Sequence, residues 1–352
     1  MSRGQALNLV MQRYGTDFDL RHGGGVERAM YQLSCALDPQ EVRLHWYSQS
    51  EHLRPQELLA FARSVDADAV IPLIDTPMLR LGWPVDPWLR QRLIRVWHDY
   101  STLRRDEASP APCPLHAAAG RSGRCMHAPT RPDHFAADVF FRDEPLTWCF
   151  PRRRHIPWAM DHLPRIDYRD PHGPVLLLAG KSPLSHTLQV VQACRELHLP
   201  VRLIFCRWTR MGQQALAHFA QARNQAGCEV ITDYELLHDH PRVFGGVRAA
   251  LVLTQFHETF NFLAAECVHF GVPVVAYAAS GATRVFASAI VPGPQQLADW
   301  LRSDSLQALP PRKLPPWGWA DVAQAYTGLV REVAAHARQA PAPAEAAGLN
   351  SC

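Results

Sequence analysis

Short apolar runs alternate with amphipathic segments along most of the chain. After the first apolar run, Val26, Met30, Leu33 and Leu37 recur at three- and four-residue spacing, which predicts a helix with one buried face. The same alternation continues to about residue 141. The first half therefore predicts strands at 6–11, 42–47, 69–73, 94–97 and 137–141, and helices at 26–37, 55–65 and 89–92.

A second series of alternating segments follows a proline-rich stretch at 156–174. Its apolar runs are nearly continuous, which is typical of parallel strands buried on both faces. Within it, Glu258 lies in a turn and Glu266 in a short helix. We expect strands at 175–179, 201–206, 229–232, 249–254, 274–277 and 287–292, and further helices at 187–197, 213–226, 234–243, 294–302 and 321–336.

Two such series in a chain of 352 residues predict two domains joined by the proline-rich linker. The expected division is an N-terminal Rossmann-like domain at 1–160, with a long loop at 102–132, and a second Rossmann-like domain at 161–320. After the second domain we expect a helix at 321–338 and a disordered tail at 339–352. In such α/β folds a ligand lies at the carboxyl ends of the strands.

Composition narrows the class of protein. The net charge of +3 allows anionic ligands but does not favour wrapping by nucleic acid. The nine cysteines lack paired spacing, and neither a secretory segment nor an apolar run of about 20 residues is present. We therefore expect a cytoplasmic protein. Arg152–Arg154 is most simply a solvated face, with peripheral contact at the inner membrane face as the alternative.

Four metal-ligating side chains fall in the loop at 102–132. They are Cys113, His116, Cys125 and His127. Their spacing leaves a zinc site open, but the second Cys-His pair is tight for a zinc module. The favoured interpretation is a surface loop that holds no metal.

Three features at predicted strand ends are candidates for chemistry. Gly23–Gly25 separates the first strand from its helix, and glycine lets a phosphate approach the backbone closely. His98 ends the fourth strand, and Lys181 follows Gly180 after the apolar run at 175–179. Each feature alone has a structural explanation, because glycine turns and buried histidines are common.

Together with the Glu258-x7-Glu266 segment, these features resemble retaining glycosyltransferases of the GT-B architecture. The likeness is to the large family 4 group that builds bacterial surface glycans. The Glu-x7-Glu segment is the specific signal, because Gly-Val-Pro at 271–273 follows it. The likeness covers about residues 5–335, with little in 102–155. It implies an α/β fold of two doubly wound Rossmann-like domains facing across a cleft.

The resemblance also implies roles for single residues. Glu266 would accept hydrogen bonds from ribose hydroxyls and Glu258 from hydroxyls of the transferred sugar. Backbone N–H groups of Asn261, Phe262 and Leu263 would face the diphosphate at the positive end of a helix.

The remaining roles concern the diphosphate and the acceptor. Lys181 would clamp the departing diphosphate, and Gly24 and Gly25 would let the backbone reach the donor. His98 would orient the acceptor or the sugar. With Glu258 and Lys181, it is a candidate catalytic residue.

Two departures from the family pattern are visible. His186 stands near the place of the family's second basic residue, which is usually lysine, and Arg207 or Arg210 would compensate. Thr259–Asn261 lacks the family's usual glycines, and there we expect donor specificity to diverge.

The resulting hypothesis is a metal-independent transfer, with retention, from a UDP- or GDP-sugar to a hydroxyl of a polysaccharide or lipid-linked glycan. The nucleotide sugar is a substrate, so no cofactor is expected. One alternative is an unusual acceptor, such as phage DNA or a protein. Another is a catalytically weak scaffold that binds a partner.

Overall fold

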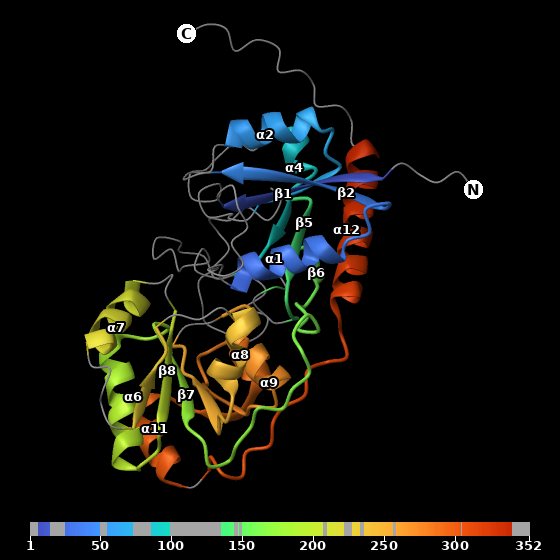
Figure 1. Cartoon of the computed structure of the whole chain (residues 1–352). Helices are drawn as coiled ribbons and strands as arrows, with labels where there is room; N and C mark the ends of the chain where they lie inside the picture. Colours follow the sequence, from blue (N-terminus) through green and yellow to red (C-terminus); the bar gives the residue numbers. More distant parts are fainter. Residues whose placement is uncertain are drawn as a thin grey trace, which may run out of the picture. The chain divides into compact units, whose positions relative to one another are not determined.

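Strands and helices alternate through most of the described residues (Figure 1). The computed structural model describes residues 6–14, 25–49, 55–72, 86–98, 135–143, 147, 150–206, 210–221, 227–232, 236–255, 258–303 and 305–339. The predicted loop at 102–132 lies outside the described residues, and so does the predicted tail after residue 339. The chain forms two compact units, one of Met1–Phe18, Ala29–Trp158 and Trp319–Cys352, the other of Asp19–Arg28 and Ala159–Gly318.

The described residues of the first unit form six parallel strands. They are β1 (Leu7–Tyr14), β2 (Val42–Gln49), β3 (Ala69–Ile71), β4 (Ile94–Val96), β5 (Ala137–Phe140) and β6 (Arg153–His155). They form two sheets of order β2-β1-β3 and β4-β5-β6, and a single bridge between Val70 and Leu93 links the two sheets. The helices that the structure describes in this unit are α1 (Gly25–Ala36, from residue 29 on), α2 (Pro55–Ser64), α4 (Pro87–Arg90) and α12 (Trp319–Gln339).

A buried ion pair joins β4 to β5. Arg95 Nε lies 2.6 Å from Asp138 Oδ1, and both side chains are fully buried. Trp97 Nε1 donates to the same oxygen at 2.9 Å, and the Arg95 guanidinium lies over the rings of Trp97 and Phe135. Burial raises the pKa of Asp138, while the charge of Arg95 opposes that shift. These contacts fix the strand end that leads directly into His98.

The second unit has one parallel sheet of six strands. They are β7 (Val175–Ala179), β8 (Val201–Phe205), β9 (Cys228–Val230), β10 (Ala249–Val252), β11 (Val274–Tyr277) and β12 (Ala287–Val291). The strand order is β12-β11-β10-β7-β8-β9. Its helices are α6 (Leu184–Glu196), α7 (Arg210–Gln221), α8 (Leu236–Phe244), α9 (Phe262–His269), α10 (Thr283–Phe286) and α11 (Pro294–Arg302). All side chains of β7, β10 and β11 are buried, as their continuous apolar sequences predict.

The sequence prediction missed one strand. The arginine run at 152–154 is exposed or half-buried, as expected for a solvated face. Nothing in the sequence indicated that Arg153–His155 also forms β6, which pairs with β5. The strand lies at the edge of its sheet, where charged residues are tolerated and apolar alternation is not required. Arg154 pairs there with Glu332 of α12.

Among the described residues, no helix combines the length and the hydropathy needed to cross a membrane.

Candidate functional site

The site is built at the carboxyl ends of three neighbouring strands of the second unit. Lys181 follows β7, Glu258 follows β10, and Thr283 follows β11. Gly180 has a φ of 94°, which an L side chain rarely adopts, and so allows the sharp turn that places Lys181 at the strand end. From β7 the chain adds β8 and β9 on one side of the sheet, and then β10, β11 and β12 on the other side. The strand order therefore reverses between β7 and β10. Open α/β sheets bind ligands at such a reversal.

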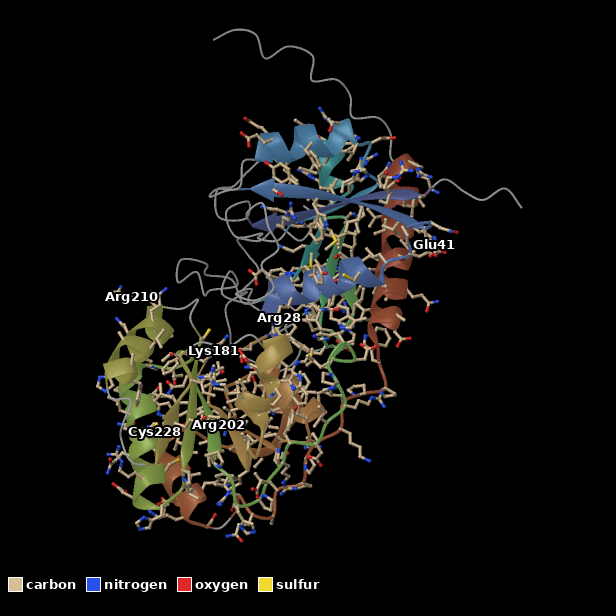
Figure 2. The ribbon with its side chains drawn as sticks, viewed as in Figure 1. Arg28, Glu41, Lys181, Arg202, Arg210 and Cys228 are labelled. Carbon is tan, nitrogen blue, oxygen red and sulfur yellow. The ribbon has the colours of Figure 1, made fainter. Side chains whose placement is uncertain are left out.

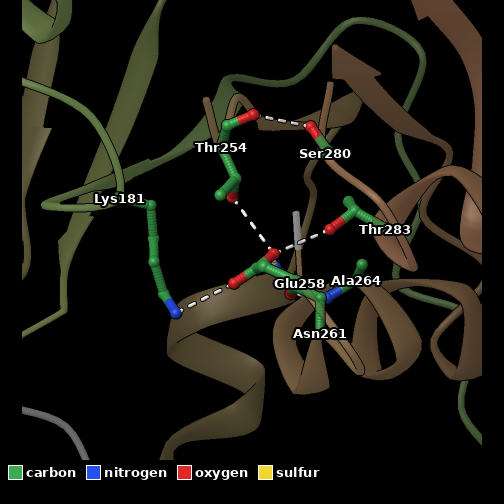
Figure 3. A network of polar contacts seen from close by, with 7 residues as sticks. All are labelled: Lys181, Thr254, Glu258, Asn261, Ala264, Ser280 and Thr283. Carbon is green, nitrogen blue, oxygen red and sulfur yellow. Dashed lines mark hydrogen bonds and ion pairs between the residues drawn. The ribbon is translucent and has the colours of Figure 1, made fainter. Parts of the chain in front are cut away.

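The carboxylate of Glu258 is the centre of a buried polar network (Figure 3). Lys181 Nζ lies 2.9 Å from Oε1. The other oxygen, Oε2, accepts from Thr254 Oγ1 at 3.1 Å and from Thr283 Oγ1 at 2.8 Å. Asn261 Nδ2 also donates to Oε2. Three uncharged donors and one ammonium therefore surround a single negative charge.

The backbone around Glu258 is held as firmly as its side chain. Its carbonyl accepts from the N–H of Ala282 at 2.8 Å, and the residue forms a parallel bridge with Gly281. Ser280 Oγ donates to the Thr254 carbonyl at 2.7 Å (Figure 3). The loops that follow β10 and β11 are therefore joined, and both approach the same carboxylate.

Helix α9 begins immediately after this network. Asn261 is its N-cap, and Oδ1 of that side chain accepts from the Ala264 N–H at 2.9 Å. The first N–H groups of a helix lack intrahelical acceptors. Because Asn261 satisfies Ala264, the N–H groups of Phe262 and Leu263 are the ones that α9 can offer to an anion.

Glu266 lies further along α9 and is almost completely buried. Arg28 Nη2 lies 2.9 Å from its Oε1. Burial raises the pKa of Glu266, and the nearby Arg28 opposes that shift by its charge and its hydrogen bond. Arg28 belongs with Gly25 to the short segment, 19–28, that is part of the second unit.

Gly25 contacts the start of α9. A Cβ atom at this position would lie 2.2 Å from Cδ2 of the Phe262 ring. Only glycine therefore permits this approach without movement of the ring. Gly25 and Arg28 are spaced by one helical turn and meet Phe262 and Glu266, which are spaced similarly on α9.

Comparison with known proteins identifies the chain. No protein-family profile matches it. It is 36% identical over 357 residues to UDP-GlcNAc:ribostamycin N-acetylglucosaminyltransferase from Streptomyces fradiae, an alignment that covers 99% of this chain and 96% of that protein. The chain belongs to this family of glycosyltransferases.

Solved structures show the same fold at low sequence identity. Sucrose-phosphate synthase from Thermosynechococcus elongatus matches with a TM-score of 0.62 and 13% identity, over 94% of this chain and 99% of that one. AviGT4, a glycosyltransferase involved in avilamycin A biosynthesis, matches at 0.57 and 16%, over 94% and 98%. HepE from Anabaena in complex with UDP-glucose matches at 0.55 and 13%, over 95% and 98%. The predicted GT-B architecture is confirmed.

Most of the residues that the sequence predicts to bind the sugar donor lie in the second unit of the glycosyltransferase. Lys181, Glu258 and Asn261 meet in one network, and Gly25 contacts Phe262. Figure 2 shows Lys181 and Arg210 at the same end of that unit's sheet, where Arg210 begins α7 and is exposed. The predicted residues Gly24 and Arg207 lie outside the described residues.

The two predicted histidines lie in contrasting surroundings. His186 is buried on α6, where its Nε2 lies 2.8 Å from the Tyr277 hydroxyl, and burial lowers its pKa. It would therefore meet a diphosphate as a neutral group and not as a cation. His98, at the end of β4 in the first unit, stacks on Trp158 with ring centroids 6.3 Å apart.

The part of the chain that the structure describes holds no group of three or more His, Cys, Asp or Glu side chains arranged for a metal. The cysteines and histidines of the loop at 102–132 lie outside that part. The absence of a metal site in the glycosyltransferase therefore remains a prediction.

Sequence reasoning missed Arg28, Thr254 and Thr283. Thr254 had a usable signal, because it stands two residues after the buried strand β10. Thr283 had a weaker signal, because it stands six residues after the end of β11. For Arg28 the only sequence signal was its position in the first turn of the helix that follows the glycine loop. Its partner, Glu266, is too distant in sequence to be inferred from spacing.

Proposed function

We propose that this glycosyltransferase moves a sugar from a UDP-sugar to an acceptor hydroxyl, with retention of anomeric configuration and without a metal ion. The observation that carries the proposal is the meeting of Lys181 and Glu258 at the strand reversal between β7 and β10. A cation for phosphate and a carboxylate for sugar hydroxyls are the two groups that a nucleotide sugar requires there.

The donor would take over some of the contacts that the side chains of the site make with one another. Lys181 is partly exposed and would turn from Glu258 to the diphosphate. Phe262 and Leu263 would add backbone N–H groups at the positive end of α9. Glu266 would take the ribose hydroxyls while its carboxylate stays paired with Arg28.

Transfer would follow a front-face course. The bond from the anomeric carbon to the diphosphate oxygen breaks, and the acceptor oxygen forms the new bond on the same face. The acceptor proton passes to the departing diphosphate. Lys181 and the N–H groups of α9 stabilise the charge that develops on the leaving group, which is commonly the largest contribution to such catalysis. His98 would orient the acceptor hydroxyl.

Metal independence is proposed because the chain supplies its own positive groups for the diphosphate. The sequence contains Asp66-Ala67-Asp68, a pattern that can hold a metal. Asp68, however, accepts from the backbone N–H of Asn8 and pairs with Arg338. That carboxylate is therefore committed to contacts within the first unit.

Donor and acceptor classes are proposed from the relatives. The Streptomyces fradiae relative is named for UDP-GlcNAc and ribostamycin, and HepE was solved with UDP-glucose. We propose UDP-GlcNAc as donor and an aminoglycoside as acceptor. The surface glycan expected from the sequence has less support than this small acceptor, because the likeness to the Streptomyces protein covers nearly the whole chain.

A donor screen tests the proposal. We expect the protein to release UDP from UDP-GlcNAc, faster with ribostamycin present and at the same rate in EDTA. Glu258→Gln should lower the turnover at least 100-fold, because the amide cannot accept both sets of hydrogen bonds. Equal turnover in the variant would refute the site. An absence of turnover with every UDP- and GDP-sugar would refute the function, and loss of activity in EDTA would refute metal independence.

A further inference from the structure

We propose that Thr254, Asn261 and Thr283 are positioning residues that divide the carboxylate of Glu258 into a fixed oxygen and a ligand-binding oxygen. The inference deepens the proposed function, on which it rests. Its basis is the uneven distribution of partners: three side chains donate to Oε2, whereas Lys181 alone among the described side chains contacts Oε1.

The count of hydrogen bonds decides which oxygen meets the sugar. A carboxylate offers about two lone-pair sites on each oxygen. Three donors already saturate Oε2, so a further hydroxyl has no place there. Oε1 holds only the Lys181 ammonium and keeps capacity for a second donor. The transferred sugar therefore donates its hydroxyl to Oε1.

The three donors come from three different segments. Thr254 stands after β10, Asn261 caps α9, and Thr283 begins α10. Figure 3 shows Thr254 and Thr283 reaching one oxygen of the carboxylate and Lys181 reaching the other. When Lys181 turns to the diphosphate, the carboxylate keeps its orientation because the three remaining donors are anchored independently. Glu258 is also only 5% exposed, so water cannot readily take the place of a lost donor.

Asn261 links two parts of the site. Its amide nitrogen reaches Glu258 while its amide oxygen caps α9. The orientation of the sugar-binding carboxylate and that of the phosphate-binding helix start are therefore coupled through one side chain.

Titration calorimetry with UDP and with UDP-GlcNAc tests the inference on wild type, Thr283→Val and Thr283→Ser. Valine keeps the shape of threonine and removes the hydroxyl, and serine restores the hydroxyl. We expect Thr283→Val to bind UDP with wild-type affinity and UDP-GlcNAc about 10-fold more weakly. Thr283→Ser should bind both as wild type does. The same pattern is expected for Thr254→Val, which serves if Thr283→Val fails to fold.

The outcomes separate the two proposals. If wild type binds neither UDP nor UDP-GlcNAc, the proposed function itself fails. If wild type binds both and Thr283→Val binds UDP-GlcNAc equally well, the positioning role fails while the function stands. Equal losses for UDP and UDP-GlcNAc would also overturn the positioning role, because they would indicate a general structural defect.

Discussion

At the scale of single residues, the charge of Glu266 depends on one partner, Arg28. Glu266 is buried and its pKa is raised, and Arg28 is the group that opposes this shift. Removing one member of a buried ion pair leaves the other charge uncompensated, which costs about 3–5 kcal/mol. The carboxylate that we propose for ribose binding would thus keep its charge through a residue from a distant segment.

Arg28→Gln should destabilise the protein more at high pH than at low pH. A raised pKa means that folded Glu266 takes up a proton which the unfolded chain releases. The stability is therefore present at acidic pH and is lost as the pH rises through the raised pKa. Without Arg28 that pKa rises further, so the loss is larger. Urea unfolding at pH 5 and pH 8 measures the difference.

The double variant Arg28→Gln/Glu266→Gln is the matched control for this prediction. It carries no buried charge at either position, so its free energy of unfolding should regain most of the loss at pH 8. A pH-independent effect of Arg28→Gln, or a double variant as unstable as the single one, would contradict the coupling.

The donor-side residues also show what sequence could and could not predict. Glu258 and Lys181 were predictable because both follow buried parallel strands, whose carboxyl ends meet at one edge of the sheet. The ion pair between them was not predictable, because it requires β7 and β10 to be neighbours in the sheet and the hydrophobic pattern does not give the strand order. The sequence suggested His186 as a substitute for the family's second basic residue. Its burial against Tyr277 could not be predicted, because that contact depends on how α6 packs against β11.

At the scale of elements, the start of α9 combines two roles in one side chain. Asn261 caps the helix with its oxygen and holds Glu258 with its nitrogen. The other end of α9 is set by Gly271, whose φ of 72° allows the turn into β11. Both ends of this short helix are thus defined by single residues.

Two substitutions of Asn261 should separate these roles. Asn261→Ala removes both the cap and the hydrogen bond to Glu258, so it should cost more folding stability than the about 1 kcal/mol of a cap alone. Asn261→Ser restores a capping oxygen but is too short to reach Glu258, so it should be about 1 kcal/mol more stable than Asn261→Ala and still less stable than wild type. Both variants should lose affinity for UDP-GlcNAc equally. Thermal unfolding and calorimetry provide the two measurements, and a serine variant with full donor affinity would argue against the amide's role.

Element boundaries show a similar limit of sequence reasoning. The runs that became β7, β11 and α11 were predicted with their observed bounds, because apolar continuity or a proline start defines them. The edge strand β6 was missed because it owes its structure to pairing with β5, and its charged side chains gave no strand pattern. The four-residue helix α10 is too short to show a period.

At the scale of the whole molecule, the proposed donor contacts all lie in the second unit. Binding of UDP should therefore stabilise that unit selectively, by about 2.7 kcal/mol at 100 times Kd. Hydrogen exchange with UDP should slow at Lys181, Glu258 and the first turn of α9. Exchange in the sheet β2-β1-β3 should not change. Equal protection of that sheet would show that the nucleotide acts on both units.

The first unit is assembled from the two ends of the described chain. Strand β1 begins it, and α12, with ten buried side chains, completes it at residues 319–339. A ribosome therefore releases β1 first and its covering helix last, after all of 159–318 has emerged. The second unit has all of its described strands available for folding while the earlier-made sheet still lacks α12. We therefore expect the second unit to complete its sheet before α12 can cover the first.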